Sequence, residues 1–313
     1  MSRKLYKYFS ADVLELVFLK EESCSIKFSK PEDYNDPYEL FLGVDLSVTL
    51  NLLASYNEIV RELPQHPTTC FSKSPAVAPM WAHYAENHSG FVIEFDLDAI
   101  QGGFERILIR DVSYKDEPSD SIAKHLHMAA GTKKPRHAYF LQQIVMSEAY
   151  FSKHTSWSYE QECRLVDQEG HCDDINGNMI LHLPISCCSS IIVGAKSSKA
   201  LSKRSQEIAQ RMGLRWFKAE IGRSSAQPYL KASDDSRAVF DGSELVSDVK
   251  VCTSCSEPSF SDNQLCPWCS ITNAHAISAA QGNPLRILDD LGLLENYFEE
   301  MSAIARSRSR NKS

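Results

Sequence analysis

The chain has 313 residues, of which 43% are hydrophobic, and it carries a net charge of −8 at pH 7. This hydrophobic content supports a real core and excludes disorder as the main state. The longest apolar runs, such as residues 191–193, are far shorter than the ~20 residues that cross a bilayer, so we expect a soluble protein without a membrane partner. The negative charge argues against a protein that coats nucleic acid through its overall field, while local basic stretches keep nucleic acid open as a partner.

The cysteines and the first residues indicate the compartment. No apolar signal stretch follows Met1, and six of the ten cysteines are scattered without a regular spacing. We therefore expect a reduced, cytoplasmic protein rather than a disulfide framework.

Short strands and helices follow one another without a regular repeat in the first two thirds of the chain. Alternating apolar and polar residues predict the strands, and apolar residues three or four apart predict the helices. Strands are expected at 5–8, 24–28, 69–72, 91–95, 106–112, 162–167, 179–183, 190–193 and 214–220. Helices are expected at 11–20, 46–63, 80–87, 119–130, 135–151 and 198–212. Because both kinds of element are mixed, residues 1–221 are predicted to form an α+β domain with a mixed, mainly antiparallel sheet and surrounding helices.

Beyond this domain the sequence predicts a linker, a metal module, a helix and a tail. Residues 222–247 are polar with little periodic apolar signal, which indicates a linker. Residues 284–305 have apolar side chains three or four positions apart, as in an amphipathic helix that packs on the metal module, drives oligomerisation or contacts a protein partner. The basic tail 306–313 is expected to be disordered, and it either solubilises the chain or touches nucleic acid.

The most specific motif is a duplicated Cys-x-x-Cys knuckle within residues 248–273. Four thiolates at this spacing converge tetrahedrally on Zn²⁺ at ~2.3 Å, and the metal replaces the core that so short a module lacks. The duplication argues against a redox dithiol, and four sulfur ligands leave no open position for catalysis. We therefore expect a structural zinc ribbon that binds nucleic acid or protein. Its ligands are Cys252, Cys255, Cys266 and Cys269.

Residues 157–166 contain the first candidate catalytic group. Glu160, Glu162 and Arg164 are spaced by two, so on a strand their side chains share one face. Two neighbouring carboxylates repel, and Arg164 offers one of them a bidentate partner, so one glutamate can stay ionised while the pKa of the other rises. This environment suits a general base or an electrostatic stabiliser. The alternative is a salt-bridge ladder on a solvated sheet face.

Residues 80–88 contain a second candidate group, rich in large side chains with polar tips. On a helix Trp81 and Tyr84 lie three residues apart and could stack a nucleobase or a nicotinamide ring, with His83 as a proton donor. The alternative is that both aromatic residues belong to the core with satisfied polar tips, which is favoured for Trp81 and left open for Tyr84.

Two polar stretches complete the set of candidates. Asn35, Asp36 and Glu39 surround Pro37, and they either form a rigid turn or line the rim of a substrate pocket.

The stretch 124–137 is basic and has no carboxylate. Its residues Lys133, Lys134 and Arg136 are therefore the best candidates for contact with nucleic-acid phosphates.

These segments together resemble the bacterial family called domain of unknown function 2971. The resemblance covers about residues 5–232 and leaves out the zinc ribbon and the helix after it. It implies a role in anti-phage defence or a toxin-like role, because members resemble accessory genes near mobile or defence loci. The corresponding motifs are Leu5–Tyr8, Phe28–Pro31, Asn35–Glu39, Cys70–Ser72, Met80–Tyr84, Gly90–Asp96, Trp157–Arg164 and Ile192–Gly194.

The order of these motifs is similar to that in ADP-ribosyltransferases. The similarity implies that Lys7 on the basic-aromatic first strand holds NAD, and that the hydroxyl of Ser72 orders the pocket. It also implies that Glu162, assisted by Glu160, stabilises the oxocarbenium ion as nicotinamide leaves. Lys7 stands where arginine or histidine is usual and lacks the fork geometry of the arginine guanidinium. Tyr8, which follows Lys7 on the first strand, is a further candidate for substrate binding.

We therefore expect an enzyme that transfers or hydrolyses a glycosidic bond at a nucleotide, with NAD or a nucleoside of nucleic acid as substrate. A DNA glycosylase that acts on phage DNA is an alternative, since the same stacking and carboxylate chemistry serves it. A further alternative is a non-catalytic sensor that binds nucleic acid or protein.

Overall fold

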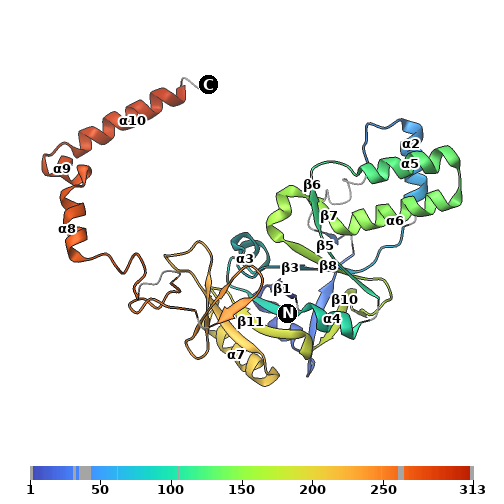
Figure 1. The fold of residues 1–313 in the computed structure, drawn as a ribbon, viewed down its shortest axis with the longest axis horizontal. Coiled ribbons are helices and arrows are strands. Elements are labelled where there is room, and N and C mark those ends of the chain that lie inside the picture. Colours follow the sequence, from blue (N-terminus) through green and yellow to red (C-terminus); the bar gives the residue numbers. More distant parts are fainter. Residues whose placement is uncertain are drawn as a thin grey trace. The chain divides into compact units, whose positions relative to one another are not determined.

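The structure is a computed structural model that describes residues 3–30, 33–34, 44–61, 63–104, 106–247, 249–259 and 264–310. These residues fall into two compact units that divide between residues 249 and 250. In the first unit a mainly antiparallel sheet is surrounded by helices, which confirms the predicted α+β class (Figure 1). None of the helices in the described residues is both long and apolar enough to cross a membrane.

Among the described residues, ten strands of the first unit form the main sheet. Their bounds are β1 Lys4–Phe9, β3 Thr68–Ser72, β4 Phe91–Asp96, β5 Ile107–Asp111, β8 Glu162–Asp167, β11 Cys188–Val193, β12 Arg215–Glu220, β13 Tyr229–Ala232, β14 Arg237–Phe240 and β15 Leu245–Ser247. The order across the sheet is β15-β14-β13-β12-β11-β4-β1-β3-β8-β5. The pair β11 and β12 is parallel, because helix α7 (Lys199–Met212) carries the chain back between them.

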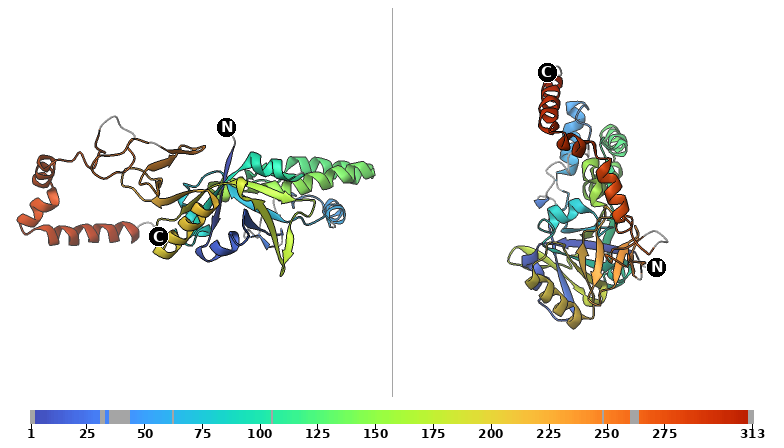
Figure 2. Two further views of the ribbon diagram at one scale, coloured as in Figure 1. Left: turned by 90° about the horizontal axis from the view of Figure 1, so that it is seen from below. Right: turned by 90° about the vertical axis from the view of Figure 1, so that its left-hand side faces the viewer.

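Two smaller sheets and six further α-helices also belong to the first unit as described. The smaller sheets are β2 Ser23–Phe28 with β10 Asn178–Pro184 and β9 Asp173–Ile175, and β6 Ser113–Lys115 with β7 Ser152–His154. The helices are α1 Leu14–Val17, α2 Leu50–Val60, α3 Ala78–Tyr84, α4 Leu97–Gly103, α5 Asp120–Thr132 and α6 Pro135–Phe151. Helices α2, α5 and α6 lie side by side beyond β5 and β8, and their facing apolar residues form a cluster of their own (Figures 1 and 2).

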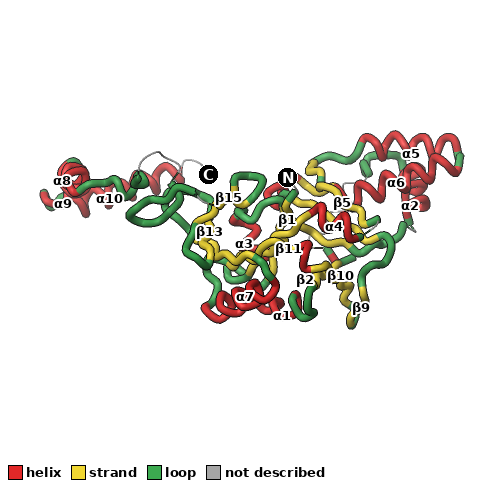
Figure 3. Tube along the Cα trace, turned by 60° about the horizontal axis from the view of Figure 1, so that its bottom comes forward, coloured by secondary structure: helices red, strands yellow, loops and turns green. Residues whose placement is uncertain are grey.

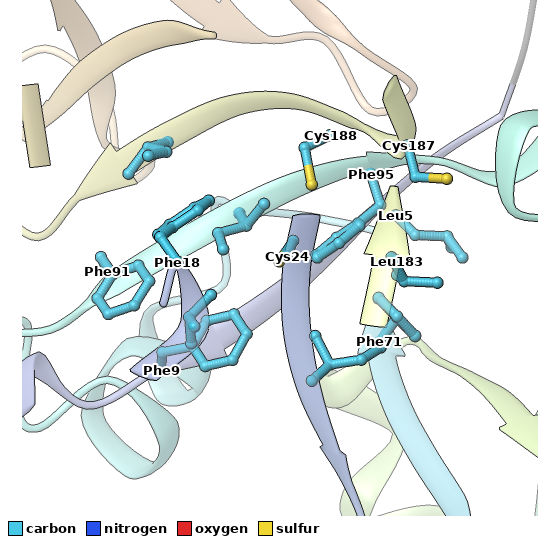
Figure 4. Packing of buried hydrophobic residues seen from close by; sticks show 14 of the residues in the cluster. Leu5, Phe9, Phe18, Cys24, Phe71, Phe91, Phe95, Leu183, Cys187 and Cys188 are labelled. Carbon is cyan, nitrogen blue, oxygen red and sulfur yellow. The ribbon is translucent and has the colours of Figure 1, made fainter. Parts of the chain in front are cut away.

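One face of the main sheet carries the largest core. Residues of β1, β3 and β4 pack there against the β2–β10 sheet and α7, which lies along β11 and β12 (Figure 3). Phe71 meets Phe95 edge to face at 5.2 Å, and Phe9 stacks on Phe91 at 5.0 Å (Figure 4). Cys187 is buried in the same cluster, and this burial raises the pKa of its thiol to about 11, so it behaves as a small apolar side chain.

The opposite face of the main sheet is covered by α3 and carries more polar groups. Tyr6 and Tyr8 alternate along β1 with the residues of the first core, and they pack with Trp81 of α3. Two glycines near this face, Gly90 and Gly194, lie close to the backbone of other segments. A Cβ at Gly90 would lie 2.1 Å from the carbonyl oxygen of Phe9, and one at Gly194 would lie 2.0 Å from that of His88.

The prediction of a linker at residues 222–247 is wrong. Strands β13, β14 and β15 occupy it and extend the main sheet by antiparallel pairing. Leu230, Ala238 and Leu245 are buried in the cluster that contains Tyr6. Each of these strands has only three or four residues, too few for periodicity to reveal them.

The second unit contains the four-cysteine module and the helices α8 Asn273–Gln281, α9 Pro284–Asp290 and α10 Leu294–Arg310. The single helix expected at residues 284–305 is therefore two helices, which Figure 1 shows separately. Gly292 separates them with a φ of +68°, a left-handed conformation that ends a helix. The expected tail is also helical as far as Arg310.

Candidate functional site

A cavity of about 190 Å³ lies where β1 and β3 separate. These strands pair at Tyr6 and Ser72, and Ser72 pairs in turn with Glu162 of β8. Cross-strand partners point to the same face of a sheet, so the three side chains face the cavity together. The lining residues are Tyr6, Lys7, Tyr8, Lys27, Ser29, Asp33, Tyr34, Thr68, Thr69, Cys70, Phe71, Ser72, Met80, Tyr84, Lys153, Glu160, Glu162 and Arg164.

Two glutamates share one buried ammonium group in this cavity. Lys153 Nζ lies 2.7 Å from Glu160 Oε2 and 3.4 Å from Glu162 Oε2. The three side chains are at most 7% exposed. Burial works to lower the pKa of Lys153, but Glu162 and Glu160 outweigh it and the pKa of Lys153 is raised. The ammonium also lies 4.7 Å from the ring centre of Trp157, so Lys153 is held as a cation.

Arg164 provides a second cation for Glu162. Its Nε donates to Glu162 Oε1 at 2.7 Å and one terminal nitrogen donates to Oε2 at 3.2 Å. Its other terminal nitrogen donates to the carbonyl of Tyr150 at 2.9 Å. Burial raises the pKa of Glu162, an effect that Lys153 opposes. The Glu162 carboxylate is thus removed from water and depends on the protein for its charge balance.

Glu160, Glu162 and Arg164 do not all lie on one strand, which corrects the prediction from their spacing. Glu160 ends a 3₁₀ helix at residues 155–160, and Gln161 follows with a φ of +48° before β8 begins. Glu162 and Arg164 share a strand face as expected, while Glu160 reaches the same cavity from the helix. Its Oε1 accepts a hydrogen bond of 2.6 Å from the hydroxyl of Tyr84 in α3.

Lys7 of β1 also lines the cavity. Its ammonium donates to the carbonyl oxygen of Cys70 at 3.1 Å, and it lies 5.6 Å from the ring centre of Phe71. Among the described residues no carboxylate lies within ion-pair distance of this ammonium. Burial lowers the pKa of Lys7, partly opposed by Glu162. An unbalanced cation in such surroundings is suited to an anionic ligand.

Several lining residues were not found by sequence reasoning, among them Lys153 and Cys70. Lys153 stands in no motif, and only its two carboxylate partners identify it. Cys70 belongs to a quoted motif but was given no role, although its side chain is open to the cavity. Removal of water from around the thiol raises the pKa of Cys70, and the nearby Glu162 raises it further.

Of the other predicted site residues, Tyr8 of the first strand lines the cavity, whereas Trp81 and His83 of the Met80–Tyr84 motif do not. Tyr8 lines the cavity and its hydroxyl donates to the carbonyl of Ser74 at 2.8 Å. Trp81 does not line it, because it is 1% exposed and its indole N–H donates to the carbonyl of Pro75 at 2.7 Å. This corrects its expected role in substrate binding. His83 is exposed and does not line the cavity either.

Asn35, Asp36 and Glu39 lie outside the described residues.

The basic residues lie at the turn between α5 and α6, where their side chains are exposed. They are Lys133, Lys134 and Arg136. Helix α6 has 17 residues, so this turn is about 25 Å along the helix from Lys153.

The four cysteines of the second unit form a compact cluster. The sulfur atoms of Cys252, Cys255, Cys266 and Cys269 all lie within 4.8 Å of one another. Those of Cys255 and Cys266 are 3.8 Å apart, which is the ~3.8 Å expected between ligands of a tetrahedron with bonds of ~2.3 Å. The cluster can therefore hold a metal ion.

Comparison with known proteins gives one match. No curated protein and no solved structure matches the chain. A family model described as "Protein of unknown function (DUF2971)" matches residues 80–165, a narrower range than the expected 5–232. The match ends one residue beyond Arg164 and leaves out Lys7 and Ser72. The resemblance to this family is thus confirmed in residues 80–165, the part of the chain that carries Tyr84, Lys153 and both glutamates of the cavity.

Proposed function

We propose that the cavity binds a nucleotide and that Glu162 stabilises the positive charge that develops on its sugar when the N-glycosidic bond breaks. The observation that carries this proposal is the pair of buried glutamates held at one ammonium and facing the cavity. Oxocarbenium-like transition states are stabilised by carboxylates in this way.

Burial of Glu162 supports its role as the stabiliser. A carboxylate that has lost its water gains most from a cation that forms in front of it, because the surroundings screen the attraction weakly. Lys153 and Arg164 keep the carboxylate in place before the reaction. Glu160 assists as a second carboxylate, and Tyr84 orients it.

Lys7 supports a nucleotide rather than a neutral sugar as the ligand. The two glutamates are matched by Lys153 and Arg164, which leaves the charge of Lys7 for a phosphate. The cavity of about 190 Å³ is smaller than the ~300–1,000 Å³ of sites for drug-sized ligands, so it suits a base with its sugar while the rest of a dinucleotide extends outside.

The reaction requires one bond to break and one to form. The bond between the base nitrogen and the sugar C1′ breaks, and the electron pair leaves with the base. Water or the hydroxyl of an acceptor then adds to C1′ and loses a proton. With NAD the leaving base is nicotinamide; with DNA it is a nucleobase, and an abasic site remains.

One observation favours DNA as the substrate of a glycosylase. This is the exposed basic turn at Lys133, Lys134 and Arg136. Such a turn can hold phosphates about 25 Å from the cavity.

The test is incubation of the purified chain with NAD and, separately, with plain or phage DNA. Release of nicotinamide, formation of abasic sites or neither distinguishes the transferase, the glycosylase and the non-catalytic binder. Glu162→Gln should reduce activity by at least 10³-fold, measured at a temperature where the variant is folded, because the loss of a buried partner for Lys153 and Arg164 also lowers its stability. Glu148→Gln is the matched control, because Glu148 also pairs with a lysine but lies outside the cavity.

Three outcomes would reject the proposal. These are no release of a base from either substrate, a Glu162→Gln variant as active as the unchanged chain, or equal losses in the two variants. DNA binding that survives Glu162→Gln but weakens with salt and with neutral residues at Lys133 and Lys134 would instead identify the binder.

We also propose that the cysteine cluster holds zinc in a structural role. Four sulfur ligands fill a tetrahedral site, which leaves no position for a substrate. One zinc per chain should be found by elemental analysis. Its removal should unfold residues 250–272, detected by loss of amide protection there, and leave the first unit folded.

A further inference from the structure

A strip of aromatic side chains borders the cavity. It begins with Tyr84 and His83 of α3 and continues with Tyr159 and Trp157 of the 3₁₀ helix at residues 155–160. The ring centres of successive members in this order are 6.4, 6.2 and 6.2 Å apart. The four rings therefore form one continuous surface, although they come from two segments that are distant in the sequence.

The aromatic strip meets the cavity at both of its ends. Tyr84 lines the cavity, and its hydroxyl donates to Glu160. At the other end the ammonium of Lys153 lies 4.7 Å from the ring centre of Trp157 and 2.7 Å from Glu160 Oε2. Glu160 is also the last residue of the 3₁₀ helix that carries Trp157 and Tyr159. A ligand in the cavity can therefore extend directly onto the strip.

The rings of the strip are held in place and still partly exposed. Tyr84 and Tyr159 pack against the buried cluster around Tyr6. Both tyrosines and Trp157 are half-buried, and His83 is exposed. Binding to rings that are already fixed by packing costs little conformational entropy.

The chemistry of the strip suits the flat ring of a base. Aromatic side chains stack on nucleobases whatever the base, because each base has a π face. The cavity of about 190 Å³ accommodates a base with its sugar, so a further base of the same ligand must bind outside it. The strip offers aromatic faces for that second ring at the border of the cavity.

We propose that the aromatic strip binds a second heteroaromatic base, joined through phosphate to the nucleotide in the cavity. This inference rests on the proposed function and extends it, because it makes a unit of two nucleotides the ligand. The second base is the adenine in NAD and the neighbouring nucleobase in DNA. Both sources share the stacking chemistry, and the experiment distinguishes them.

The experiment compares, by calorimetry, ligands with and without the second ring. The first pair is the carbocyclic analogues of NAD and of nicotinamide mononucleotide, whose sugar cannot form an oxocarbenium ion, so the bond to nicotinamide persists. The second pair is a DNA dinucleotide with adenine as its second base and the same dinucleotide with an abasic second position. The second ring should tighten binding at least about fivefold. A gain in the first pair alone identifies the adenine of NAD, and a gain in the second pair alone identifies a neighbouring nucleobase.

Substitutions at Tyr159 and His83 test the strip itself. Tyr159→Leu keeps an apolar side chain without the ring and should abolish the gain, while the affinity for the mononucleotide stays unchanged. Tyr159→Phe should retain the gain, because stacking uses the ring and not the hydroxyl. His83→Ala changes an exposed side chain, so it leaves the fold intact, and it should reduce the gain even if Tyr159→Leu does not fold. Tyr297→Leu is the matched control, since Tyr297 is partly exposed and lies 6.0 Å from Phe298 in the second unit.

Four results would overturn the inference while a bound mononucleotide leaves the proposed function standing. They are no gain from the second ring in either pair, a gain that survives both Tyr159→Leu and His83→Ala, an equal loss in Tyr297→Leu, and a loss in Tyr159→Phe as large as in Tyr159→Leu. If none of the four ligands binds, the proposed function and this inference both fail.

Discussion

Lys153 gives the sharpest test of the arrangement in the cavity. Lys153→Met keeps the length of the side chain and removes its charge. The ammonium group and its two carboxylate partners are nearly inaccessible to solvent, so water cannot replace the lost cation. Removing one member of a buried ion pair costs about 3–5 kcal/mol, because the remaining charge is left unbalanced.

For Lys153→Met the loss of stability should lie in the lower part of that range. Glu162 keeps both hydrogen bonds from Arg164, and Glu160 keeps the one from Tyr84. We expect unfolding in urea at pH 8 to show a loss of about 3 kcal/mol. Lys115→Met is the control, since its pair with Glu148 is about a quarter exposed, and its loss should be about 1 kcal/mol or less.

The pH dependence of this loss follows from Glu162. Burial already raises the pKa of Glu162 in the folded chain, and the missing Lys153 would raise it further. A carboxyl group whose folded pKa lies above its unfolded value of ~4.3 destabilises the fold when ionised, and this effect vanishes as the pH falls through the folded pKa. The deficit of Lys153→Met should therefore shrink between pH 8 and pH 5. A deficit below 1 kcal/mol at pH 8, or one equal at both pH values, would refute the reasoning.

Three further predictions concern other positions. Gly194→Ala should lower stability by about 2–4 kcal/mol in urea unfolding, because its Cβ would lie 2.0 Å from a carbonyl oxygen. Gly131→Ala in α5 is the control, where a Cβ meets nothing within 4 Å, and it should stabilise the chain by about 0.5–1 kcal/mol. Equal effects of the two substitutions would contradict the close approach at Gly194. Cys70 should react slowly with iodoacetamide at pH 7 and faster at pH 9.5, as measured by peptide mass mapping, since burial and the nearby Glu162 raise the pKa of its thiol; rapid reaction at pH 7 would contradict the raised pKa. Lys7→Met should abolish nucleotide binding in calorimetry without lowering the melting temperature; binding as tight as that of the unchanged chain would remove the phosphate role of Lys7.

Sequence reasoning identified much of the cavity because several of its residues stand in motifs with recognisable chemistry. Glu162 and Arg164 follow from their spacing on a strand, and Tyr84 from the aromatic cluster of α3. Trp81 shows the limit of that method. Its spacing is compatible with both stacking and core packing, and only the hydrogen bond to the carbonyl of Pro75 with its burial decides for the core.

Lys153 shows why the rest could not be predicted. A lone lysine after a helix is usually solvated, and nothing in its neighbours along the chain indicates burial. Its position depends on Glu160 ending a 3₁₀ helix and Glu162 beginning a strand, two local events that meet only in three dimensions. The strands β13–β15 were missed for a related reason, since their stability comes from pairing with β12 rather than from their own short sequences.

The charge balance of the cavity links stability to binding. The carboxylates of Glu160 and Glu162 are matched by Lys153 and Arg164, and all four side chains are almost wholly buried. Lys7 is the exception, because it loses hydration without gaining a carboxylate among the described residues. A methionine there would fill the same space between Phe9 and Phe71 without this cost. If Lys7 serves an anionic ligand, stability and affinity must therefore respond to its replacement in opposite directions, whereas a purely structural lysine would lower both together.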